Sequence, residues 1–126
     1  MPLTNAYRDW SVGRTTGSAT PVFDNTNSYI GVGDSAAAFA ATQTDLQAAA
    51  NKMRKVVNAT YPTTTANVLV FQSTFATGDA NWAWQEWGVF NASSAQTMLS
   101  RKVESLGTKT SAQSWQFTAT ITFAVA

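Results

Sequence analysis

The chain has 126 residues, of which 44 % are hydrophobic and 12 % are charged, and it contains neither Cys nor His. This length is typical of one domain, and the missing residue types exclude disulfides, thiolate metal sites and the commonest general base. Eight Lys and Arg against seven Asp and Glu leave no basic surplus for binding phosphates. We therefore expect one domain that does not bind nucleic acid and whose polar surface is mainly uncharged.

Residues 1–27 are the least regular part of the sequence, and Gly, Thr, Ser and Asn dominate their second half. They nevertheless contain Tyr7, Trp10 and Phe23, whereas segments that stay solvated are normally poor in aromatic residues. Two interpretations remain open, a loose tail and an extended arm that orders against a neighbouring subunit. We expect the extended arm, with the three aromatic side chains as its anchors.

The first ten residues show no basic region followed by an apolar stretch, the pattern of a secretory signal. No window of the sequence approaches the ~20 apolar residues that span a bilayer. We expect the protein to be made and folded in a cytoplasm, without a membrane partner.

Residues 28–33 are typical of a short strand that ends in glycines. The pair Gly31 and Gly33 lacks the further glycine and the Lys of phosphate-binding loops, so we expect no cofactor. Residues 42–58 predict the one helix, because apolar residues from Leu46 to Val57 recur every three or four positions. Thr42 and Asp45 would cap its beginning, and the basic residues 52, 54 and 55 would form its solvated end.

From residue 67 onward the hydrophobic pattern alternates with a period of two, which indicates strands. The predicted strands are 68–75, 81–91, 97–106 and 114–125. The fold class is therefore mainly β with one α-helix. We expect an antiparallel, jelly-roll-like β-sandwich over residues 28–126, preceded by the arm.

Glu86 is the one acid in an unusual setting, since it lies between Trp84 and Trp87 in an aromatic strand. If the loop 92–95 sets the hairpin register, Glu86 faces Arg101 on the next strand. We expect a structural ion pair between them, and the alternative is an acid whose pKa is raised by an apolar pocket. The other acids are scattered singly, and without His no Ser-His-Asp triad can form. We therefore expect no catalytic residues, no metal site and no enzyme activity.

Tryptophans crowd the same strand at positions 82, 84 and 87. Strict alternation places Trp82 and Trp84 on one face and Trp87 on the other, so the strand is apolar on both sides. Such a strand is buried between two layers or docks another subunit. We expect Trp82, Trp84 and Trp87 at a subunit interface, and the alternative is a carbohydrate-binding module that stacks sugars on exposed rings.

Two pairs of short motifs resemble small virion proteins and fibre-attachment domains of tailed bacteriophages. The first pair is Glu86-Trp87-Gly88-Val89-Phe90-Asn91 followed by Met98-Leu99-Ser100-Arg101-Lys102. The second pair is Tyr29-Ile30-Gly31-Val32-Gly33-Asp34 followed by Thr44-Asp45-Leu46. The resemblance spans residues 28–125, leaves the arm unmatched and carries over no catalytic residue.

The resemblance implies a structural protein of the phage virion, assembled in the host cytoplasm. We expect it to decorate or stabilise the capsid, and the alternative within this class is a tail or fibre-attachment protein. Its partners would be copies of itself, as a trimer, and a major capsid or tail protein. The shortage of charge agrees, because uncharged polar strands lose little hydration energy when subunits pack.

Overall fold

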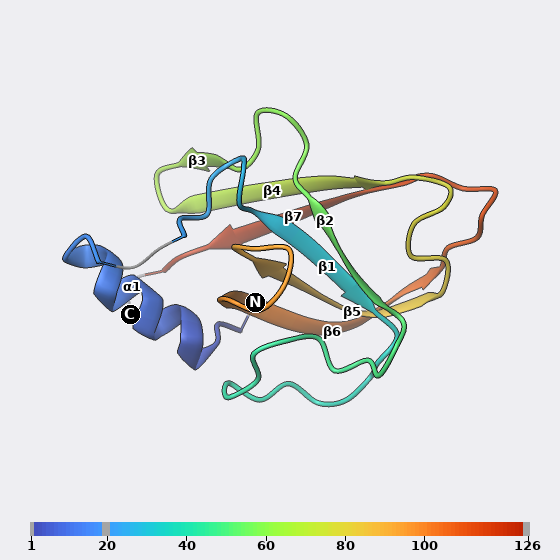
Figure 1. Ribbon diagram of the computed structural model, residues 1–126, viewed down its shortest axis with the longest axis horizontal. Helices are drawn as coiled ribbons and strands as arrows, with labels where there is room; N and C mark the ends of the chain where they lie inside the picture. Colours follow the sequence, from blue (N-terminus) through green and yellow to red (C-terminus); the bar gives the residue numbers. More distant parts are fainter. Residues whose placement is uncertain (1, 19–20, 125–126) are drawn as a thin grey trace.

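The computed structural model describes residues 2–18 and 21–124 and shows two antiparallel sheets with one helix. The expected mainly β sandwich is confirmed. Figure 1 shows the two sheets in separate layers, with the helix beyond one end of the strands. The helix is α1 (Asn5–Thr15), and the strands are β1 (Tyr29–Gly33), β2 (Lys52–Val56), β3 (Thr63–Thr65), β4 (Val68–Phe75), β5 (Ala83–Phe90), β6 (Met98–Thr108) and β7 (Trp115–Thr122).

The first sheet has the strand order β2-β1-β5-β6. Strand β1 lies between two antiparallel neighbours, with Val32 opposite Met53 of β2 and opposite Trp87 of β5. Ile30 and Val32 are fully buried, as expected of a strand with partners on both sides. The hairpin of β5 and β6 completes this sheet.

The second sheet has the order β3-β4-β7, and β4 and β7 pair over eight residues from Val68 opposite Thr122 to Phe75 opposite Trp115. Phe71, Phe75, Ala119 and Ile121 point into the sandwich and are at most 3 % exposed. The residues that alternate with this inward set, such as Gln72, Thr74 and Thr120, therefore face outward.

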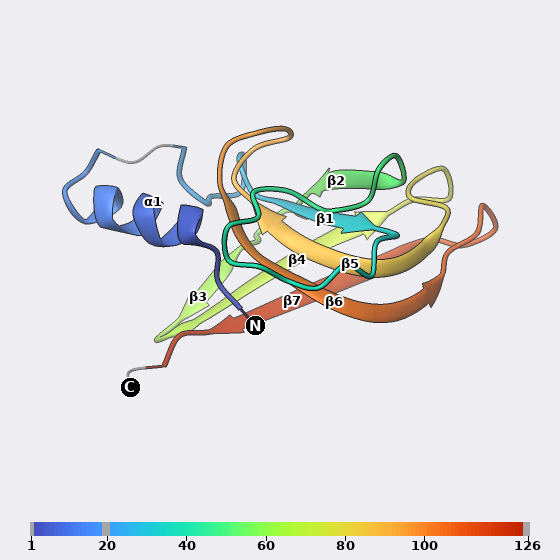
Figure 2. The same cartoon turned by 90° about the horizontal axis from the view of Figure 1, so that it is seen from below.

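Aromatic rings fill the space between the sheets. Trp84 of β5 packs edge-to-face on Phe75 at 4.9 Å and on Trp115 at 5.0 Å, measured between ring centroids. Trp87 packs in the same way on Phe117 at 4.9 Å. Both tryptophans of β5 thus bury their rings between the two sheets. Figure 2 shows the strands of the two sheets crossing one another.

The helix predicted over residues 42–58 is wrong. Residues 34–51 form a long loop, and 52–56 form strand β2. The backbone N–H groups of Gln47 and Ala48 donate to the Glu86 carboxylate, both at 2.8 Å, instead of to helical carbonyls. The apolar spacing matched a helix, but pairing with β1 and this long-range anchor outweigh the modest helix propensity of the segment.

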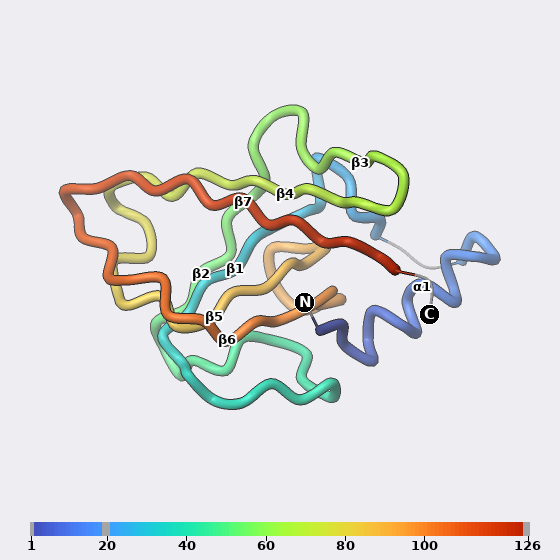
Figure 3. The backbone as a smooth tube through the Cα atoms, turned by 180° about the vertical axis from the view of Figure 1, so that it is seen from behind, coloured from blue at the N-terminus to red at the C-terminus, as the bar shows by residue number. Residues whose placement is uncertain are grey.

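The arm 1–27 is not extended throughout, because residues 5–15 form α1. Thr4 caps the helix by accepting from the Tyr7 N–H at 3.0 Å, and its own hydroxyl donates to the Met98 carbonyl of β6. Gly17, at φ +81°, ends the helix by donating to the Arg14 carbonyl. The side chain and backbone of Thr4 therefore fix the start of α1 against the first sheet, and Figure 3 shows the helix beyond one end of the strands.

Candidate functional site

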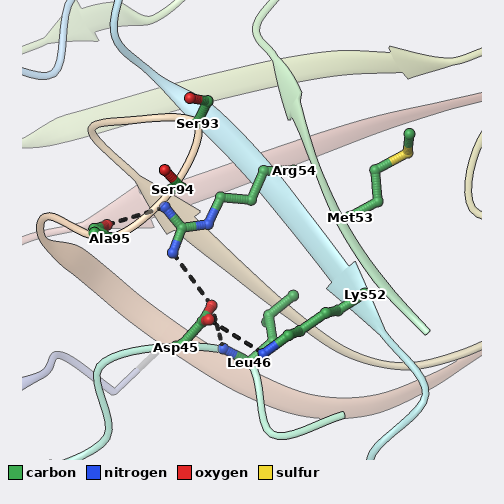
Figure 4. Close-up of a pocket in the computed structure, with 8 residues that line it drawn as sticks. All are labelled: Asp45, Leu46, Lys52, Met53, Arg54, Ser93, Ser94 and Ala95. Carbon is green, nitrogen blue, oxygen red and sulfur yellow. Dashed lines mark hydrogen bonds and ion pairs between the residues drawn. The ribbon is translucent and has the colours of Figure 1, made fainter. Parts of the chain in front are cut away.

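A pocket of about 230 Å³ lies between strand β2 and the loop that joins β5 to β6 (Figure 4). Its lining residues are Asp45, Leu46, Lys52, Met53, Arg54, Ser93, Ser94 and Ala95. Three segments that are distant in the sequence therefore meet here: the loop 34–51, strand β2 and the loop 91–97.

Arg54 is the centre of this pocket. Its guanidinium lies 3.7 Å above the Phe90 ring, a cation–π distance, and it donates to the Ala92 and Ala95 carbonyls at 2.9 and 3.0 Å. It also contacts Asp45 at 3.2 Å, and its side chain is only 8 % exposed. These contacts hold the loop 91–97 and the loop 34–51 against β2.

Asp45 accepts three interactions, from Leu46 N–H at 2.8 Å, from Arg54 and from Lys52 at 3.2 Å. Burial alone would raise the pKa of Asp45, but the Leu46 hydrogen bond and the two cations outweigh it, so the pKa lies below its usual value. A carboxylate that stays ionised in this way is a weak proton acceptor. The charged side chains of the pocket are paired with one another and serve as a brace between the loop 34–51 and strand β2.

Glu86 and Arg101 form a second, fully buried cluster. The Arg101 Nε lies 2.7 Å from Glu86 Oε1, and both side chains are 0 % exposed. The guanidinium also donates to Gln43 Oε1 at 3.1 Å and to the Ala37 carbonyl at 2.9 Å. The expected structural ion pair is present, and it anchors the loop 34–51 on the sheet.

The pair forms although the predicted register is wrong. Arg101 lies opposite Gly88, and Glu86 lies opposite Val103. Phe90 pairs with Met98, one position beyond the simple hairpin, and the register shift between Val89 and Phe90 adds a second position. A shift of two keeps every side chain on its face, so Glu86 and Arg101 still meet diagonally.

The surface role predicted for Trp84 and Trp87 is wrong, because they are 1 % and 6 % exposed within the chain's own core. The ladder is irregular between Trp84 and Glu86, which lets both rings reach the space between the sheets despite their odd spacing. Trp82 is half-buried, and its Nε1 is buried without a hydrogen-bond partner in the described ranges. Two of the three rings proposed for sugar stacking are therefore inaccessible.

Tyr7, Trp10 and Phe23 pack on one another within the chain. Tyr7 stacks on Trp10 at 5.4 Å, and Phe23 meets Trp10 edge-on at 4.9 Å. Tyr7 also contacts Phe123 at 6.0 Å and lines a pocket of about 300 Å³ beside the β3–β4 hairpin. Burial raises the pKa of Tyr7. These rings hold α1 on its own sandwich, and their contact with a neighbouring subunit stays a prediction.

Sequence reasoning missed Lys109, which is 1 % exposed. Its Nζ donates to the Ala76 carbonyl at 2.7 Å and to Asn81 Oδ1 at 2.8 Å, so it braces the loop between β4 and β5. Position 109 follows a strand directly and looks like an ordinary solvated lysine. The two acceptors lie about thirty positions away, and no local pattern signals them.

The outer face of the second sheet carries no charge. Its residues, which we call the uncharged face, are Thr63, Thr65, Val68, Val70, Gln72, Thr74, Gln116, Thr118, Thr120 and Thr122. They are all exposed or half-buried. By contrast, each of the seven acids accepts a hydrogen bond or ion pair from another residue of the chain.

No protein-family model matches the chain, and neither a curated protein nor a solved structure matches it. Among the described residues, no group of three or more acids could hold a metal ion. In the same part of the chain, no helix combines the length and the apolar character needed to cross a membrane.

Proposed function

We propose that this chain is a non-enzymatic structural protein of a bacteriophage virion, which decorates or stabilises the capsid by packing against copies of itself. The observation that carries the proposal is the uncharged face. A surface of Thr, Val and Gln loses little hydration energy when it is covered, whereas buried charges must find partners. The chain's acids lie outside this face, and the one fully buried acid, Glu86, is paired with Arg101.

The phage context rests on the motif resemblance of residues 28–125. The motif residues have structural tasks: Gly33 makes room for the Glu86 carboxylate, which a Cβ would overlap, and Arg101 neutralises that carboxylate. The protruding helix α1 would contact the capsid or tail protein. A tail or fibre-attachment position is the alternative within this class.

Self-association is tested by light scattering on the purified chain. We expect an oligomer for the wild type. Val70→Lys places a charge at the centre of the uncharged face, opposite Thr63 and Thr120, and should shift the protein toward the monomer. Val103→Lys is the matched control, because Val103 lies on β6 in the other sheet and is 37 % exposed. A monomeric wild type would contradict the packing role.

Virion location is tested by quantitative mass spectrometry of particles purified from the phage whose genome carries this coding sequence. Many copies per particle would place the protein on the capsid, and a handful would place it on the tail. Its absence from purified particles would refute the proposal.

A further inference from the structure

The four outer strands of the two sheets differ in how they are protected from pairing with another chain. Strand β2 carries Lys52, Arg54 and Lys55, strand β3 has three residues, and β6 is interrupted by two register shifts and bridged by Leu3. Charges, shortness, irregularity and coverage are the usual means of blocking an edge. Strand β7 has none of them: it has eight residues, no charge and no proline, and its ladder to β4 is regular.

The outer edge of β7 has unused backbone groups. The Phe123 N–H donates to the Asn67 carbonyl, so the odd-numbered residues of β7 bond to β4 and the even-numbered ones point away. In the described ranges, β7 has no neighbour in its sheet other than β4. Figure 2 shows the C-terminal half of β7 at the border of the molecule. The N–H and C=O groups of Gln116, Thr118, Thr120 and Thr122 are therefore open to an added strand.

We propose that β7 pairs antiparallel with β7 of a second copy about a two-fold axis, joining two three-stranded sheets into one of six strands. This inference rests on the proposed self-packing through the uncharged face and adds a second contact, at the edge of the same sheet. The register that pairs all four even-numbered residues is centred on Ala119. It places Thr118 opposite the partner's Thr120, and Phe117 opposite the partner's Ile121, so no like charges meet.

A second copy suits this edge better than a strand of another protein. The two β7 edges are identical in length and carry no charge, so one strand–strand contact pairs the open backbone groups of both. The outer strands of the joined sheet are then the two copies of β3, which are too short to continue the pairing. An isologous contact of this kind predicts an even number of copies, in place of the trimer expected from the resemblance.

The test compares Thr120→Pro with Thr120→Ala. Proline removes an N–H that the β4 ladder does not use, and edge positions tolerate it, whereas Ala keeps the N–H. We expect Thr120→Pro to raise the dissociation constant at least tenfold and Thr120→Ala to leave it within about twofold, with unchanged circular dichroism for both. If the wild type is oligomeric and Val70→Lys dissociates it while Thr120→Pro does not, the edge contact is refuted and the proposed packing stands.

A cross-linking experiment covers the case in which Thr120→Pro does not fold, and it uses the absence of Cys in the wild type. In the proposed register, Cα atoms of residue 118 and residue 120 of the partner lie about 5.5 Å apart, within the range of a disulfide. An oxidised mixture of Thr118→Cys and Thr120→Cys chains should give the mixed dimer, and each variant alone should give little. Equal cross-linking in all three samples, or none, would contradict the proposal.

Discussion

The Glu86 carboxylate and the Arg101 guanidinium meet at 2.7 Å with both side chains fully buried, although neither lies opposite the other in the β5–β6 ladder. The carboxylate also accepts the N–H groups of Gln47 and Ala48. Burying two charges is costly, and the cost is offset here because their hydrogen-bonding atoms find partners in the loop 34–51. The eighteen residues 34–51 contain no helix or strand, and the buried ion pair holds this loop in place on the sheet.

A double-mutant cycle tests this coupling. Glu86→Gln and Arg101→Met should each lower the free energy of unfolding by about 3–5 kcal/mol, since each leaves a buried charge without its partner. The double variant should lose less than the sum of the two. The measurement is urea unfolding, and strictly additive losses would show that the pair is not coupled. Lys102→Met, at an ion pair with 48 % side-chain exposure, is the control and should cost less than about 1 kcal/mol.

Gly33→Ala should destabilise the fold because a Cβ at this position overlaps the Glu86 carboxylate. That carboxylate is held by Arg101 and two backbone N–H groups, so it cannot move aside without losing them. We expect a loss of about 1–3 kcal/mol, typical of an overpacked site. Gly78→Ala is the matched control, since a Cβ there meets nothing within 4 Å, and an equal loss in both variants would contradict this account.

Strands β4 and β7 of the second sheet could be predicted because one of their faces is buried. The alternation from Trp115 to Thr122 and from Val68 to Phe75 reflects that burial directly. The segment 42–58 shows why the same method fails elsewhere. Strand β2 has only five residues, and its pairing with β1 is a long-range contact that leaves no local signal. The helical spacing of Leu46, Met53 and Val57 therefore belongs to residues that never form one element.

Of the two charged clusters, one could be predicted from the sequence and the other could not. Glu86 and Arg101 could be predicted because they belong to one hairpin, where a register error of two preserves the face. The Arg54 brace could not be predicted, since its carbonyl partners Ala92 and Ala95 belong to a loop after another strand.

Helix α1 had a weak local signal in its Thr4 cap, which Gly13 and β-branched Val12 and Thr15 obscured.

Asp79 should make stability fall in acid. Hydrogen bonds from Lys55 and from the Ala76 N–H lower the pKa of Asp79 below its usual value. The native state therefore binds this proton less readily than the unfolded state, so the stabilisation is complete above the unfolded pKa of about 4 and is lost as pH falls further. Urea unfolding of the wild type and Asp79→Asn should differ at pH 7 and converge toward pH 2.5. A difference that stays constant with pH would contradict this role, and Lys55→Met should weaken the pH dependence in the same way.

Trp10→Ala should release α1 without unfolding the sandwich. No residue of α1 is fully buried, so the helix depends on the stack with Tyr7 and Phe23 and on the bond from Trp10 Nε1 to the Pro21 carbonyl. Trypsin should then cut after Arg8 and Arg14 about tenfold faster or more, because cleavage follows the population of the open form. Val12→Ala, on the same helix at 66 % exposure, is the control and should be cut at the wild-type rate. Unchanged cleavage of Trp10→Ala would mean that the Thr4 cap and its contacts with β6 alone hold the helix.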